Sequence, residues 1–195
     1  MCPCADTTTT VTTTTSAAAV IRPLLAGEEH LVREVFDGLS SDARYLRFHT
    51  PTPRLTDAAL RSLATVEKGV RGAMVALVGG HAVGLAQWAR DPASPQRAEL
   101  AMAVADAHQG RGNGRALLTR IAEEVAAHGI DELVCHVHHE NARVGRMLRR
   151  LGARRAADGV LVVPVALLNG EARAMSAVLL WTDAVPGPRT PAGGR

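Results

Sequence analysis

The 195-residue chain has few aromatic residues and almost no lysine. With only two Trp, one Tyr and two Phe, the core must consist mainly of Ala, Val and Leu. The length suffices for one domain with a sizeable core. Lys68 is the only lysine among the 22 Lys and Arg residues, and the net charge of +3 is too small to indicate a nucleic-acid partner. The shortage of aromatic rings for base stacking also argues against nucleic acid.

Long hydrophobic runs and paired cysteines are missing too. The longest apolar stretch, residues 160–168, is far shorter than a membrane span and contains Pro164, so we expect no membrane insertion. Three cysteines cannot all pair, and the Thr-rich beginning lacks the basic and apolar regions of a signal peptide, so we expect a cytoplasmic protein. Cys2 and Cys4 have no second cysteine pair to complete a metal site, and we expect no metal.

The composition divides the chain into three parts. Residues 1–18 are Thr- and Ala-rich without an apolar period and are expected to form a disordered tail. Residues 19–182 are expected to form one folded domain, and residues 183–195 a Pro/Gly-rich tail or a linker to a further domain of a longer chain.

Apolar periodicity and turn residues predict the elements of that domain. Helices are expected to begin near Gly27, Ser40 and Thr56, at residue 115 and at residue 141, the last of them ending at Gly152. Strands are expected over residues 20–25, 73–78, 82–89, 98–104, 132–138, 154–157 and 160–168. Turns are expected at Gly79-Gly80, over residues 91–96 and at Asp158-Gly159.

The most informative stretch is the run Gln109 to Arg115, which lies between a predicted strand and a predicted helix. Glycines let the backbone approach a ligand, and the first N–H groups of a helix attract anions. Arg111 and Arg115 add positive charge, so the run is predicted to bind a pyrophosphate. The G-x-G-x-x-G dinucleotide motif does not fit the spacing, and the nucleotide P-loop would need a Lys-Ser or Lys-Thr pair that the chain lacks.

The pattern that does fit is Q-x-x-G-x-G, formed by Gln109, Gly112 and Gly114, with Val104 five residues before the glutamine. It resembles the acetyl-CoA-binding motif of the GNAT acetyltransferase superfamily. The predicted order of elements over residues 20–168 also resembles the GNAT fold. That resemblance implies an α/β fold with a mixed, mostly antiparallel sheet of about seven strands, flanked by helices and splayed between strands 4 and 5.

Within the superfamily, residues 40–48 with the following Pro-rich break, and the phrase Ala98-Glu99-Leu100-Ala101, resemble bacterial protein lysine acetyltransferases that modify acyl-CoA synthetases. The resemblance implies acetyl-CoA as the acetyl donor. It also implies that Asn141 contacts the cofactor arm, although an asparagine there is equally typical of a helix N-cap. The remaining residues implied to bind acetyl-CoA are Met102, Ala103 and Val104 through their backbone along the pantetheine arm, and Gln109, Gly110, Arg111, Gly112, Asn113, Gly114 and Arg115 around the pyrophosphate.

Glu99 is the candidate general base. A lysine amine has an ordinary pKa of about 10.4 and arrives protonated, so a proton acceptor must lie close by. Glu99 stands in an otherwise apolar strand, and the resemblance implies the same role. The alternative is that Glu99 faces solvent or pairs with an arginine such as Arg97. His136, expected to share a strand face with His138, is a second base candidate, although both are more typical of ordinary polar residues at a strand end.

One family feature is missing, because Leu148 stands where many GNAT enzymes carry a tyrosine that protonates the leaving thiolate. Water or another donor is left for that step. The favoured interpretation is an N-acetyltransferase that modifies a protein lysine, with an acyl-CoA synthetase as the expected protein partner. The alternatives are an acetyltransferase for a small-molecule amine and a non-catalytic module that senses acyl-CoA.

Overall fold

The computed structural model describes residues 19–156 and 160–169. Within them, one mixed sheet of seven strands runs in the order β1-β2-β3-β4-β5-β7-β6. Only the pair β4 and β5 is parallel, and the other neighbours are antiparallel. The strands are β1 (Val20–Pro23), β2 (Arg71–Val78), β3 (His81–Asp91), β4 (Ser94–Val104), β5 (Glu132–Cys135), β6 (Arg154–Arg155) and β7 (Leu161–Pro164). The expected fold class is confirmed.

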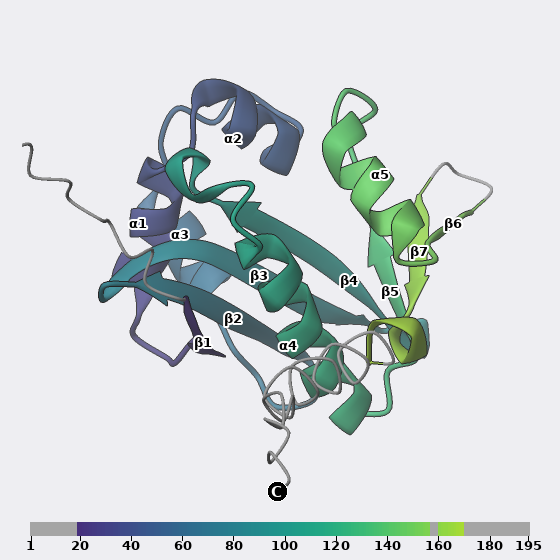
Figure 1. Cartoon of the computed structure of the whole chain (residues 1–195). Coiled ribbons are helices and arrows are strands. Elements are labelled where there is room, and N and C mark those ends of the chain that lie inside the picture. The colour runs from purple at the N-terminus through teal and green to yellow at the C-terminus, as the bar shows by residue number, and fades with distance from the viewer. Residues whose placement is uncertain (1–18, 157–159, 170–195) are drawn as a thin grey trace, which may run out of the picture.

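Helices cover both faces of this sheet. Figure 1 shows α4 in front of the sheet, with α1 and α3 behind it. The helices are α1 (Glu29–Asp37), α2 (Ser41–Phe48), α3 (Asp57–Ala64), the 3-10 helix η1 (Asp106–His108), α4 (Asn113–Ala127) and α5 (Ala142–Arg150). α2 and α3 begin where expected, and Ser40 and Thr56 cap them, because their hydroxyls accept hydrogen bonds from the backbone N–H groups of Ala43 and Ala59.

Each face of the sheet has its own apolar core. Val75 and Leu85 pack against α1 and α3 on one face, where Val35 and Phe36 are buried. On the other face, a larger core joins the sheet to α4 and α5, and its buried members include Ala86, Leu100, Leu117, Ile121, Leu133 and Leu148. The side chains of a strand alternate between the two faces, so the position of a β4 residue decides which helices it meets.

Most predicted boundaries differ from the structure by one or two residues, as at the strand expected over residues 20–25, which ends at Pro23, and three differ by more. The second hairpin is tighter than the expected turn over residues 91–96, because Asp91 pairs with Ser94 and leaves two residues in the turn. The strand expected over residues 132–138 ends at Cys135, since its pairing with β7 stops there. The segment expected as a strand over residues 160–168 is a strand only to Pro164, and residues 165–169 are helical. The tails and the turn at Asp158-Gly159 lie outside the described residues.

The sheet splays between β4 and β5. The two strands pair over only three positions, from Arg97 with Glu132 to Glu99 with Val134. Beyond this point β4 continues to Val104, still paired with β3, while β5 ends at Cys135. In Figure 1 the two strands meet near one end of the sheet and diverge toward α2 and α5. The β4 segment that follows Glu99 therefore has no strand neighbour on its β5 side among the described residues.

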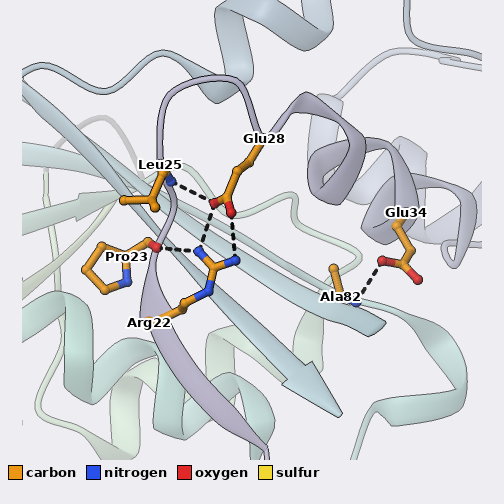
Figure 2. A network of polar contacts seen from close by, with 6 residues as sticks. All are labelled: Arg22, Pro23, Leu25, Glu28, Glu34 and Ala82. Atoms are coloured by element: carbon orange, nitrogen blue, oxygen red, sulfur yellow. Dashed lines mark hydrogen bonds and ion pairs between the residues drawn. The ribbon is translucent and has the colours of Figure 1, made fainter. Parts of the chain in front are cut away.

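Two carboxylates fix α1 to the sheet, as Figure 2 shows. Both guanidinium ends of Arg22 donate to the Glu28 carboxylate at 2.8 Å, and the Leu25 N–H donates to the same carboxylate at 2.8 Å. These hydrogen bonds hold the pKa of Glu28 below its ordinary value, Arg22 being the largest cause. One turn into α1, Glu34 accepts a hydrogen bond from the Ala82 N–H at 2.8 Å, which is the main cause of its lowered pKa. The two contacts set the position of α1, and α2 follows directly from it.

Candidate active site

The glycine run lies at the start of α4, as expected. Gly110 and Gly112 adopt φ angles of +77° and +86°, which only glycine adopts without strain. A Cβ atom at Gly112 would meet nothing within 4 Å, so the loop is open on that side. Because the first turn of a helix leaves its N–H groups without intrahelical partners, this open loop presents donors to an anion.

Gln109 and Asn113 shape the loop from inside. The Gln109 amide donates to the Val104 carbonyl at 3.1 Å and to the Asp106 carboxylate at 3.0 Å. Asn113 is only 8% exposed, and its side-chain amide donates to the His108 carbonyl at 2.9 Å. The structure therefore gives both side chains a role in holding the loop, while cofactor contact by their backbone stays a prediction.

Arginines begin α4 and α5, where acidic residues would be favourable. The first turns of α1, α2 and α3 carry Glu29, Asp42 and Asp57, whereas those of α4 and α5 carry no acid. Arg115 and Arg143 stand there instead. A helix N-terminus carries a partial positive charge, and an arginine there adds to the positive potential. Both first turns thus favour a phosphate ligand.

Arg143 links the two helix starts. Its guanidinium donates to the Gln109 side-chain carbonyl at 3.4 Å, and a methyl group at Gly110 would lie 3.3 Å from its Nη2. With the exposed Arg111, these residues make a positive region at the α4 and α5 ends on the same face of the sheet. A pyrophosphate carries the matching negative charge.

Met102, Ala103 and Val104 form the end of β4 beyond the splay. Each is half-buried, and they pair with Ala86, Leu85 and Gly84 of β3. The other edge of this segment faces the gap left by β5. An extended, amide-rich ligand can pair with such an edge as a strand would.

Glu99 occupies the last position at which β4 still pairs with β5. Its neighbours Ala98 and Leu100 are buried in the α4 core, so alternation places Glu99 on the opposite face, which carries α1, α2 and α3. The residue is exposed, and α2 contacts β4. Among the described residues Arg97 pairs with Glu132 and not with Glu99. A carboxylate is therefore accessible at the point where the sheet opens.

Arg47 and Gln87 lie beside Glu99 on this face. Arg47 of α2 donates to the Gln87 side-chain oxygen at 2.8 Å, and the Gln87 amide donates to the Leu63 carbonyl at 2.6 Å. Burial lowers the pKa of the Arg47 guanidinium, and the charge of Glu99 opposes that shift. On the other side of the splay, burial and then the charge of Glu99 raise the pKa of the Cys135 thiol to about 12. Cys135 therefore remains protonated at neutral pH.

Aromatic and imidazole rings bridge α2 to the loop that follows β5. The His138 ring lies 5.0 Å from that of Tyr45 and 5.5 Å from that of His49, centroid to centroid, and its side chain is 13% exposed. His49 has a φ of +59°, a left-handed conformation that a non-glycine residue rarely adopts. These rings thus connect α2, which contacts β4, with the loop that follows β5. The expectation that His136 and His138 share a strand face is wrong, because the strand ends before them and His136 is exposed in the loop.

Two residues of α5 have clear structural roles. Asn141 is the N-cap, since its side-chain oxygen accepts a hydrogen bond from the Val144 N–H at 3.2 Å. The two interpretations of Asn141 do not exclude each other, and contact with the cofactor stays a prediction. Leu148 is 2% exposed within the α4 core, so this position serves packing and supplies no proton donor.

Comparison with known proteins decides the family. Residues 33–153 match the model of the acetyltransferase (GNAT) family. The chain belongs to the GNAT family. It is accordingly an N-acetyltransferase of the GNAT type, and the family uses acetyl-CoA as the acetyl donor. The open glycine loop and the two arginine-bearing helix starts fit the phosphates of that donor.

Several solved structures resemble this GNAT domain. The GNAT domain of S. lividans PAT is 28% identical with a TM-score of 0.67, over 74% of this chain and 88% of that one. A cAMP-binding acyltransferase from Mycobacterium smegmatis is 24% identical with a TM-score of 0.52, over 82% of this chain and 48% of that one, so the chain spans about half its length. A putative acetyltransferase from Salmonella typhimurium, solved with its cofactor acetyl-CoA, is 19% identical with a TM-score of 0.62, over 76% and 95% of the two chains. The latter two show the fold alone.

Sequence reasoning missed Arg47, Gln87, Tyr45, His49 and Arg143. For Arg143 a signal existed, since an arginine in the first turn of a predicted helix opposes the helix dipole. The others come from elements that the sheet brings together across about 40 residues or more, such as Arg47 with Gln87.

In the described part of the chain no helix is long and apolar enough to cross a membrane, and no group of three His, Cys, Asp or Glu residues is placed to hold a metal ion.

Proposed function

We propose that this protein transfers the acetyl group of acetyl-CoA to a lysine side chain of another protein, an acyl-CoA synthetase being the favoured acceptor. The observation that carries the proposal is the position of Glu99, an accessible carboxylate at the point where β4 and β5 part. The likeness to the GNAT domain of S. lividans PAT supports a protein acceptor. A cytoplasmic location and a further domain in a longer chain belong to the same proposal.

The donor is proposed to approach on the face that carries α4 and α5. Its pyrophosphate would meet the glycine run from Gln109 to Arg115 and the guanidinium of Arg143, where both helix starts favour an anion. Its pantetheine arm would run along the edge of residues 102–104, between β4 and β5. Asn141 lies at the opposite side of this gap and is proposed to contact the arm.

The acceptor is proposed to enter from the opposite face, which carries α2. Glu99 lies on this face, so a thioester in the gap and an amine on the α2 side would meet beside its carboxylate. Tyr45, His49 and His138 contact one another between α2 and the loop after β5, and they are proposed to flank the methylene stem of a lysine. A backbone N–H near Val104 is proposed to stabilise the oxyanion, a contribution of about 3 kcal/mol for a single donor.

The chemistry removes two protons from the lysine nitrogen. The lysine ammonium first loses one proton to solvent, because only the neutral nitrogen can attack the thioester carbon. As the C–N bond forms and the C–S bond breaks, the nitrogen gives its second proton to Glu99, and the thiolate leaves with the electron pair of the C–S bond. The thiolate has an ordinary pKa of about 8.5, so water can protonate it without a dedicated acid at the position of Leu148. Glu99 then returns its proton to solvent.

Labelled acetyl-CoA tests this proposal. The protein is incubated with it in the presence of purified acyl-CoA synthetases and, separately, of small amines such as polyamines and aminoglycosides. We expect label on a synthetase lysine, identified by peptide mass spectrometry. Label on small amines alone would replace the acceptor class with the small-molecule alternative. If acetyl-CoA binds but labels no acceptor, a sensing module is the better description.

A further inference from the structure

Arg47 of α2 is an unusual residue to find on the acceptor face. Its guanidinium is half-buried, and among the described residues no carboxylate lies within the 4.0 Å of an ion pair. A buried cation is costly unless hydrogen bonds and a counter-charge compensate it. The hydrogen bond to Gln87 and the nearby charge of Glu99 supply this compensation.

The neighbours of Arg47 fix its position. Gln87 is itself held by the Leu63 carbonyl at 2.6 Å, so the guanidinium is linked through β3 to α3. The guanidinium carbon also lies 5.0 Å from the centre of the Phe48 ring, and Phe48 packs against Phe36 of α1 at 5.9 Å. α2 is thus anchored with its cation on Gln87, which pairs with Ala101 of β4, two residues from Glu99 on the same face of the strand.

A fixed cation at this place acts on the acceptor. A nearby positive charge favours the neutral form of an amine, and a lysine beside another cationic group is activated in this way. The reaction requires a neutral nitrogen, whereas the Glu99 carboxylate by itself would attract and retain the ammonium form. A guanidinium that lies near Glu99 without forming an ion pair with it repels the ammonium and so offsets the attraction of the carboxylate.

We propose that Arg47 is a positioning residue whose charge favours the neutral amine of the acceptor beside Glu99. This inference rests on the proposed function. Charged and titratable groups from several elements face Arg47 or its helix. They are Glu99 from β4, Asp106 from η1, His138 and His139 from the loop after β5, and Asp42, Arg44, Tyr45 and His49 on α2 or at its end.

The pH dependence of kcat tests the charge of Arg47. With the full chain and a saturating amine acceptor, kcat is measured between about pH 6 and pH 10 for the parent protein, Arg47→Gln and Arg47→Lys. In Arg47→Gln we expect the acidic limb of the kcat profile to move to higher pH by about one unit, because the ammonium keeps its proton longer. Arg47→Lys retains the charge and should leave the limb within a few tenths of a unit of the parent.

Arg44→Gln is the matched control on the same helix. Arg44 also lies over a phenylalanine ring, that of Phe36 at 4.2 Å, and it donates to the Phe36 and Pro53 carbonyls. Its loss should lower the melting temperature without moving the limb. Acetyl-CoA affinity, measured by calorimetry, should be the same in all four proteins.

Two results would overturn the inference while leaving the proposed function intact. One is an Arg47→Gln protein whose kcat falls by the same factor at every pH, and the other is an Arg47→Lys protein that behaves like Arg47→Gln. Either result would mean that Arg47 serves packing or hydrogen-bond geometry alone. A parent protein that acetylates no amine contradicts the proposed function, and the inference fails with it.

Discussion

Replacing Gly114 with alanine separates acetyl-CoA binding from the stability of the fold. Gly114 is in the first turn of α4 and, unlike Gly112, does not have a positive φ. An added Cβ would lie 3.8 Å from Cγ2 of Val104, an ordinary contact. Alanine in a helix is favoured over glycine by about 0.5–1 kcal/mol, so Gly114→Ala should keep or slightly raise the melting temperature.

The same substitution should weaken the binding of acetyl-CoA. If the pyrophosphate approaches the first N–H groups of α4, the methyl group obstructs one charge-assisted hydrogen bond. Such a bond contributes about 1.5–3 kcal/mol, which corresponds to a roughly 10- to 100-fold weaker Kd for acetyl-CoA. Calorimetry with acetyl-CoA measures the Kd, and a thermal melt of the same sample measures the stability.

Gly112→Ala is the companion variant. Its Cβ would meet nothing within 4 Å, but a φ of +86° makes alanine strained there, at a cost of about 1–2 kcal/mol. This protein should therefore melt earlier than the parent, whereas Gly114→Ala should not. A Gly114→Ala protein that binds acetyl-CoA as tightly as the parent would refute the assignment of this helix start to the pyrophosphate.

Three further outcomes follow from the contacts described above. Arg143→Gln should weaken acetyl-CoA binding about tenfold and reduce its salt dependence, since it removes a positive charge at the start of α5. An unchanged affinity, measured by calorimetry, would mean that the phosphates bind elsewhere. Cys135, 3% exposed and with its pKa raised to about 12, should resist iodoacetamide at pH 8 until urea unfolds the protein, and peptide mass spectrometry showing rapid labelling of the native protein would contradict that burial. Glu28→Gln should lower the free energy of unfolding at pH 7, measured in urea, because it removes the ion pair with Arg22. Because the folded pKa of Glu28 lies below its ordinary 4.5, its stabilisation is complete above that pH and lost as the pH falls through the folded pKa, so the variant and the parent should converge in acid; a constant difference at every pH would count against the ion pair with Arg22.

Local patterns predicted most of the fold. The apolar period of α1 and the caps at Ser40 and Thr56 are properties of neighbouring residues, and the structure confirms them. Gly79 and Gly80 form the expected two-residue turn, both with positive φ. The family resemblance added the topology, since strand order and the splay at Glu99 depend on pairings between distant segments.

The misplaced boundaries have physical reasons that a sequence pattern does not contain. Residues 136–138 continue the apolar and polar alternation of β5, but β4 has already diverged and β7 ends its pairing at Cys135. The apolar run after Pro164 turns helical and places Val165 and Leu168 in the α4 core. Periodicity measures which residues are apolar, whereas a strand also needs a partner.

The candidate site was likewise predictable from the sequence only in part. The glycine run and Glu99 could be found from the sequence, because a turn between strand and helix and a charge in an apolar strand are local features. The surroundings of Glu99 could not, since Arg47 and Cys135 reach it from α2 and β5. Their effect on one another depends on distances that only the folded sheet sets.

The most direct test of the account is a comparison of acetyl transfer and acetyl-CoA binding in Glu99→Gln. Glutamine keeps the shape of the side chain but accepts no proton at neutral pH. We expect kcat for the protein acceptor to fall by about 100-fold or more, while the calorimetric Kd for acetyl-CoA and the melting temperature stay at the parent values. A Glu99→Gln protein that acetylates its acceptor at the parent rate would contradict the central claim.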